Sequence, residues 1–166
     1  FEEAMVSPRS DLMRMLFEVG DAAAFAARME LVVPPGTRWQ YSSGTSNILS
    51  KIIRQTVGDA NYPRYAYENL FYKLGMQHTI IEPDASGTFV GSSYGYASAR
   101  DWARFGLLFL NDGMWNGERI LPEGWSKFVA TQGAVQPAGN GARYGAQFWI
   151  YGGMDGLAAD AYSPGG

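Results

Sequence analysis

Apolar residues near the start of the chain recur at helical spacing and predict two short helices. Ser7 followed by Pro8 is typical of a helix start, because serine caps the first turn and proline suits its first position. The helical pattern of apolar residues then continues up to Gly20, which ends this first helix. Asp21 predicts the cap of a second helix that runs to about Met29. The Pro-Pro-Gly sequence at 34–36 breaks the chain after it.

Four more helices are predicted further along the chain. The first ends at Gly58 and presents one apolar stripe made of Ile48, Leu49, Ile52, Ile53 and Val57. The same spacing predicts helices at about 63–74, 98–111 and 122–129, whereas residues 76–97 look irregular because proline and glycine interrupt them.

Residues 144–151 alternate between two faces and predict one β-strand. Tyr144, Ala146, Phe148 and Ile150 face one way, and the residues between them face the other. A lone strand is not stable without partners, so we expect sequence outside this chain to complete its sheet. The pattern as a whole predicts an α+β fold made mainly of helices.

Composition excludes several classes of protein. The chain has 166 residues and a net charge of −3, without a basic run, which argues against nucleic-acid binding. It holds no cysteine and one histidine, so neither a thiolate metal site nor a multi-histidine site is expected. No apolar stretch approaches the roughly 20 residues that span a bilayer. The first residue is Phe1 and the last is Gly166, so we expect an internal piece of a longer protein.

The residues alone provide no complete catalytic set. His78 follows a helix end and is expected to be a surface or capping residue. No Ser-x-x-Lys sequence, which would place an amine one helical turn from a hydroxyl, is present. Tyr41 is different, because it ends an extended run just before a helix and small residues follow it. A nearby ammonium would lower the pKa of such a phenol and make it a base. Lys51 is too distant along the helix to supply it, and a tyrosine that only fills a pocket at the helix entry remains an alternative.

Four segments, in order, resemble the beta-lactamase-like serine hydrolase family over nearly the whole chain. This family includes class C beta-lactamases, D-alanyl-D-alanine peptidases, certain esterases and 6-aminohexanoate-dimer hydrolase. The first segment is PGTRWQYSS at 35–43, followed by the helix that ends at Val57. The others are LGM at 74–76, SARDWARFG at 98–106, and GERILP at 117–122 with Trp125.

The resemblance implies roles for four residues. Tyr41 matches the tyrosine of the family's Tyr-x-Asn motif, which accepts the proton of the nucleophilic serine and returns it to the leaving group. Ser43 stands where many members have asparagine, a departure that favours the aminohexanoate-dimer type over classical beta-lactam hydrolysis. Ser92 and Tyr94 lie in a loop that borders the substrate pocket of relatives, although a plain turn explains that loop equally well.

The function implied is hydrolysis of an ester or amide through an acyl-enzyme, without a metal or cofactor. The resemblance implies that residues 1–166 are part of one beta-lactamase-like domain, the helical lobe plus one strand of its antiparallel sheet. The N-terminal Ser-x-x-Lys part and the C-terminal strands of the same fold are then expected in missing segments. Many relatives belong to the bacterial periplasm or cell envelope. This chain alone is expected to be inactive.

A second hypothesis is a non-catalytic family member or fragment that binds peptide-like or glycan ligands. Its contacts would be the aromatic side chains of Trp39, Tyr94, Trp149 and Tyr151. Packing within the core is the alternative explanation for the same four side chains.

Overall fold

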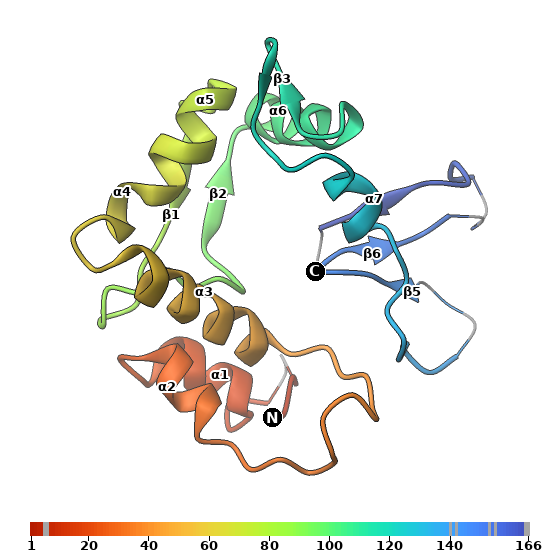
Figure 1. Cartoon of the computed structure of the whole chain (residues 1–166). Coiled ribbons are helices and arrows are strands. Elements are labelled where there is room, and N and C mark those ends of the chain that lie inside the picture. The colour runs from red at the N-terminus through yellow and green to blue at the C-terminus, as the bar shows by residue number, and fades with distance from the viewer. Residues whose placement is uncertain (5–6, 140, 142, 153, 155, 165–166) are drawn as a thin grey trace. The chain divides into compact units, whose positions relative to one another are not determined.

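A computed structural model describes residues 1–4, 7–139, 141, 143–152, 154 and 156–164. The chain forms two compact units, shown with their helices and strands in Figure 1. Unit 1 comprises Phe1–Glu30 and Tyr41–Phe105, and unit 2 comprises Leu31–Gln40 and Gly106–Gly166.

Unit 1 begins with three helices: α1 (Asp11–Phe17), α2 (Ala22–Ala27) and α3 (Ser43–Val57). The predicted cap of α2 is confirmed, because the Asp21 side chain accepts a hydrogen bond from the Ala24 N–H at 2.9 Å. The predicted start of the first helix was wrong, since Ser10 rather than Ser7 caps α1. The Ser10 hydroxyl is fully buried and also donates to the Ala4 carbonyl at 2.6 Å, so burial selects the later serine.

Helix α3 packs through small and polar residues rather than through its predicted apolar stripe. Its buried residues are Ser43, Gly44, Asn47 and Ser50. Leu49, Ile52 and Ile53 are 42%, 49% and 46% exposed. A Cβ on Gly44 would lie 3.0 Å from the Ala26 Cβ, so α2 and α3 meet at a contact that only a small residue permits. Of the predicted stripe, Ile48 packs against the core cluster of Leu12, Met15, Ala22 and Ala26.

The next predicted helix is confirmed and contains an irregular turn. It runs through α4 (Tyr62–Ala66), the π-helical segment η1 (Tyr67–Phe71) and α5 (Tyr72–Leu74). Gly75 then ends it with a φ of 69°, a left-handed conformation that glycine adopts at little cost. Residues 76–97, expected to be irregular, also form a short antiparallel pair between β1 (Thr79–Ile81) and β2 (Gly95–Ala97).

Helix α6 (Ala99–Leu110) was predicted and is confirmed. The Ser98 hydroxyl caps it by accepting a hydrogen bond from the Asp101 N–H at 3.2 Å. Unit 2 takes up the end of this helix and continues with β3 (Met114–Trp115), β4 (Glu118–Arg119) and α7 (Trp125–Val129). Strands β3 and β4 pair as a hairpin.

The prediction of a single strand at 144–151 was wrong. This segment turns back on itself, so that β5 (Arg143–Tyr144) pairs antiparallel with β6 (Trp149–Ile150). The Gly145 N–H donates to the Phe148 carbonyl at 2.8 Å and closes the turn. A Cβ on Gly145 would lie 2.0 Å from the Val129 carbonyl oxygen, so only glycine fits there. Strand β7 (Tyr162–Ser163) pairs with the other edge of β6.

The structure therefore confirms an α+β chain, but with several small antiparallel sheets in place of one strand. The described part has two two-stranded sheets and one three-stranded sheet, which lies within unit 2. Among the helices of the described residues, none has the length and apolar character needed to cross a bilayer.

Candidate functional site

Tyr41 and Ser43 lie at the start of α3, where the Tyr41 side chain is half-buried rather than enclosed in the core. Ser42 precedes the helix in an extended conformation, and its own side chain makes no capping hydrogen bond in the described structure. The carboxylate of Glu3 takes that role: it accepts from the Ser43 N–H at 3.1 and 3.0 Å and from the Ser43 hydroxyl. A carboxylate is well placed there, because the exposed N–H groups of a helix start attract negative charge.

Asn47 connects this helix start to the loop that contains Ser92. It lies one helical turn after Ser43 and is 1% exposed. Its amide nitrogen donates to the Ser43 carbonyl and to the Ser92 hydroxyl, both at 2.9 Å. Its oxygen accepts from the Gly91 N–H at 3.1 Å. Two of the predicted site residues, Ser43 and Ser92, are thus brought together through one buried amide.

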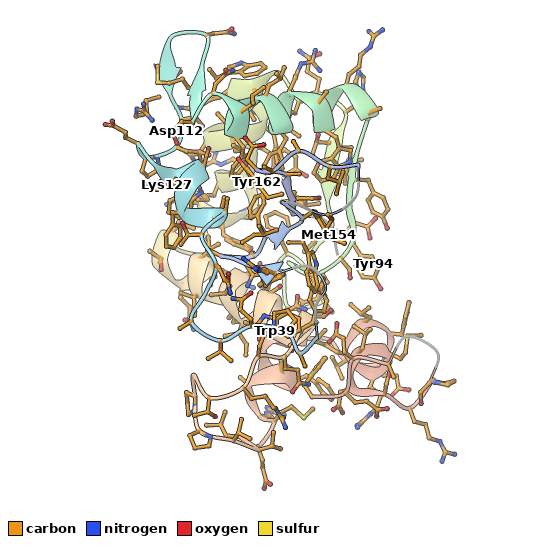
Figure 2. The ribbon with its side chains drawn as sticks, turned by 90° about the vertical axis from the view of Figure 1, so that its right-hand side faces the viewer. Trp39, Tyr94, Asp112, Lys127, Met154 and Tyr162 are labelled. Atoms are coloured by element: carbon orange, nitrogen blue, oxygen red, sulfur yellow. The ribbon has the colours of Figure 1, made fainter. Side chains whose placement is uncertain are left out.

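Tyr94, labelled in Figure 2, is held separately from that amide. Its hydroxyl donates to the Leu16 carbonyl at 3.5 Å, and its backbone has a φ of 60°, which is uncommon for a residue with a side chain. Burial, and then the Tyr96 phenol and the Glu82 carboxylate, raise the pKa of Tyr94 above its ordinary value. The phenol therefore keeps its proton and acts as a hydrogen-bond donor rather than a base.

Lys51, the lysine nearest to Tyr41 along the sequence, contacts a different residue. Its Nζ lies 3.2 Å from the Asp21 carboxylate. Burial alone would raise the pKa of Asp21, but the Ala24 N–H and the Lys51 ammonium outweigh it and lower the pKa below its ordinary value. Lys51 thus links α3 to the residue that caps α2. Its distance from Tyr41 along the helix predicts that it does not serve that phenol.

His78 is exposed, which confirms its predicted place at the surface. Its backbone N–H donates to the buried Asp101 carboxylate at 2.8 Å, and the Arg104 guanidinium lies 2.7 Å from the same group. Burial alone would raise the pKa of Asp101, but these hydrogen bonds and one from Thr79 lower it below its ordinary value. Asp101 is therefore ionised at neutral pH and connects the first turn of α6 to the start of β1.

The aromatic residues of the second hypothesis fall into different units. In unit 2, the rings of Trp39, Tyr144 and Trp149 contact one another edge to face, with centroids 4.9 to 5.6 Å apart. Trp39 is labelled in Figure 2. Tyr94 belongs to unit 1. Two of the four predicted ligand contacts, Trp39 and Trp149, therefore pack against each other, but both are only half-buried and neither belongs to the buried core.

Within the described ranges, no group of three histidine, cysteine, aspartate or glutamate side chains is arranged to hold a metal ion. What the site offers is one half-buried phenol beside a helix start, a serine at the first turn and a loop tied to that helix by an amide.

A family model described as Beta-lactamase matches residues 3–166. The chain belongs to the beta-lactamase family. This is a family of serine acyl hydrolases, so the resemblance found in the sequence is confirmed. No curated protein matches the chain.

The chain is also similar to a solved structure, "Putative 6-aminohexanoate-dimer hydrolase from Bacillus anthracis", with 29% identity and a TM-score of 0.68. The match covers 80% of this chain and 35% of the other, so this chain spans about a third of the length of that relative.

Sequence reasoning missed Asn47, although this residue organises the site. The signal was available, because Asn47 lies four residues after Ser43 and therefore on the same face of the helix. The apolar stripe of α3 predicts a different buried face, and the polar Asn47 is not part of that stripe.

Proposed function

We propose that this chain supplies the general base of a serine hydrolase that cleaves an ester or amide through an acyl-enzyme. A serine of a Ser-x-x-Lys segment outside residues 1–166 attacks the substrate carbonyl. Tyr41 takes the proton from that serine and gives it to the leaving group. Water then releases the acyl group, with Tyr41 accepting the proton of the water. The lysine of the same segment keeps the Tyr41 phenol ionised.

The observation that carries this proposal is the position of Tyr41 in a chain that belongs to the family. It is half-buried and lies two residues before α3, and the sequence from Tyr41 to Ser43 resembles the family's Tyr-x-Asn motif. A ring enclosed in the apolar core would have been incompatible with proton transfer to a substrate. The fit of the solved hydrolase structure at 29% identity adds support for this class of reaction.

The other three residues are proposed to contact the substrate. The Ser43 hydroxyl is engaged by Glu3 in this structure, so substrate contact requires it to exchange that partner. Ser92 receives its hydrogen bond from Asn47 and retains lone pairs that accept further ones. Tyr94 is proposed as a donor, in keeping with its raised pKa, and must release the Leu16 carbonyl to donate to the substrate.

The same proposal treats residues 1–166 as part of a domain. The Ser-x-x-Lys segment and further strands of the sheet then come from polypeptide outside this chain and fold with it. The bacterial periplasm or cell envelope is the compartment suggested by many relatives.

The test is Tyr41→Phe in a longer protein that joins this chain to a Ser-x-x-Lys segment. We expect kcat/KM for a p-nitrophenyl ester to fall by about 10²–10⁴-fold, the usual contribution of a general base. Labelling of the nucleophilic serine by a fluorophosphonate should become slow, with the circular dichroism spectrum unchanged. Tyr72→Phe is the matched control, since Tyr72 is 64% exposed. Near-normal turnover by Tyr41→Phe would remove Tyr41 as the base.

A further inference from the structure

Unit 1 contains a pocket that does not include the proposed general base. Its volume is about 530 Å³, within the range of small-molecule sites. Three segments line it: the middle of α3, the helix at 62–74 and the loop that leads into β2. Neither Tyr41 nor Ser43 is among the lining residues, whereas Ser92 and Tyr94 are. The pocket therefore shares one loop with the candidate site but not its base.

The lining indicates the kind of molecule that fits. No charged residue lines the described pocket, and Ile53, Leu70 and Ile81 contribute apolar side chains. The Ser50 hydroxyl is already bonded to the Tyr62 hydroxyl and the Phe89 carbonyl, both at 2.7 Å. A charged molecule would lose its hydration here without gaining a partner, so the pocket favours a neutral, largely apolar one.

The Ser93 hydroxyl is one polar group of the lining that remains available. It makes no hydrogen bond to any residue that the structure describes, while its backbone N–H is bonded to the Val90 carbonyl at 3.1 Å. A hydroxyl can donate one hydrogen bond and accept others. It provides a polar contact for a molecule that is otherwise apolar.

Two unusual backbone conformations occur in the lining. Leu70 belongs to the π-helical segment η1, a form that is rare in proteins and frequent at functional sites. Tyr94 has a φ of 60°, a conformation that costs free energy for a residue with a side chain. The backbone around this cavity thus departs from regular geometry at two separate places.

We infer that this pocket is a binding site for a neutral aromatic molecule with one hydrogen-bonding group, distinct from the Tyr41 site. The ring packs among Ile53, Leu70 and the neighbouring aromatic side chains, and its polar group bonds to the Ser93 hydroxyl. The inference does not depend on the role of Tyr41, because neither Tyr41 nor Ser43 lines the pocket.

The experiment titrates the chain with p-cresol and follows binding by protein NMR and calorimetry. We expect a dissociation constant of about 1 mM or tighter for p-cresol, and at least about tenfold weaker binding of 4-hydroxybenzoate, which has the same ring and hydroxyl but a negative charge. Equal affinity for the two, or no binding of p-cresol, would overturn the inference.

Substitutions at two neighbouring isoleucines of α3 test where p-cresol binds. Ile53→Trp fills the pocket and should abolish p-cresol binding, whereas Ile52→Trp should leave it unchanged, because Ile52 is equally exposed but does not line the pocket. Loss of binding in both variants, or in neither, would place p-cresol elsewhere and contradict the inference.

Ser93→Ala provides a test that does not depend on a new bulky side chain. This variant should weaken p-cresol binding several-fold and leave toluene binding unchanged, because toluene lacks the hydroxyl. An equal loss for both molecules would show that Ser93 supplies no specific contact and would overturn its part in the site.

Discussion

Asn47 is the side chain on which the local geometry of the candidate site depends most. It is buried and bonded to Ser43, Gly91 and Ser92 at once. Every buried polar side chain of the described structure has such a partner, so replacing one member leaves others unsatisfied. The relation between the helix start and the loop is therefore set by hydrogen bonds rather than by apolar packing.

Asn47→Ala is predicted to destabilise the chain by about 1–3 kcal/mol, because the Gly91 N–H and the Ser43 carbonyl lose their partner in the interior. Urea unfolding followed by circular dichroism measures the change. Asn61→Ala is the control: Asn61 is exposed and donates one hydrogen bond to the Val57 carbonyl, so a change within about 0.5 kcal/mol is expected. Equal effects of the two variants would refute the role assigned to Asn47.

Asp101 is predicted to make stability depend on pH at the acid end. Its pKa is lower in the folded chain than in the unfolded one. At a pH between these two pKa values, the unfolded chain therefore binds more protons than the folded chain. The contribution of Asp101 to stability is fully present above the pKa of the unfolded chain, about 3.9. It is lost as the pH falls through the lower pKa of the folded chain.

Asp101→Asn should lower stability at neutral pH and flatten the acid limb of the curve of stability against pH, measured by urea unfolding between neutral and acid pH. Asp160→Asn removes the same charge from an exposed position and should leave the limb unchanged. An acid limb that stays as steep in Asp101→Asn would show that other carboxylates cause it.

At the level of elements, helix positions were predictable and strand positions were not. The helices ending at Gly58 and Gly75 carry their stop signals in the sequence, and both end there. The face of α3 that packs was not predictable, because its contact is made by Gly44, Asn47 and Ser50, which carry no hydrophobic signal. The pairing of Glu3 with Ser43 joins residues far apart in the sequence, and no local pattern indicates it.

The hairpin at 143–150 escaped prediction for a related reason. Alternation of apolar and polar residues is the same for one long strand and for two short strands around a turn. The feature that decides is the close approach of Gly145 to the Val129 carbonyl, which depends on α7 being folded nearby. The sequence contains Gly145, but it does not show that the Val129 carbonyl lies beside it in the folded chain.

Gly145→Ala is predicted to cost about 1–3 kcal/mol in unit 2, because its Cβ would overlap the Val129 carbonyl oxygen and push the hairpin away. Tryptophan fluorescence during urea unfolding reports the change, since Trp39 and Trp149 contact each other in that unit. Gly141→Ala is the matched control, because a Cβ there meets nothing within 4 Å. A cost for Gly141→Ala as large as that for Gly145→Ala would contradict this account.

At the scale of the whole molecule, the chain carries a candidate base but, among its described residues, neither serine that directly precedes a lysine is activated by that lysine. In a serine–lysine pair, the serine becomes nucleophilic when the amine lies within hydrogen-bond reach. The Ser50 hydroxyl is bonded to Tyr62 and Phe89, while the neighbouring Lys51 contacts Asp21. The Ser126 hydroxyl donates to the Phe109 carbonyl at 2.6 Å. Each of these two serines is therefore adjacent to a lysine in the sequence but is not hydrogen-bonded to it.

Residues 1–166 alone are therefore predicted to hydrolyse p-nitrophenyl esters no faster than buffer and to remain unlabelled by a fluorophosphonate. Joined to a Ser-x-x-Lys segment, the same residues should support labelling of the added serine, because Tyr41 then has both a proton donor and a cation beside it. Intact-mass spectrometry measures the label, and peptide mapping locates it. A label found on a serine within these residues would mean that the chain activates its own nucleophile, and the division of catalytic groups argued above would fail.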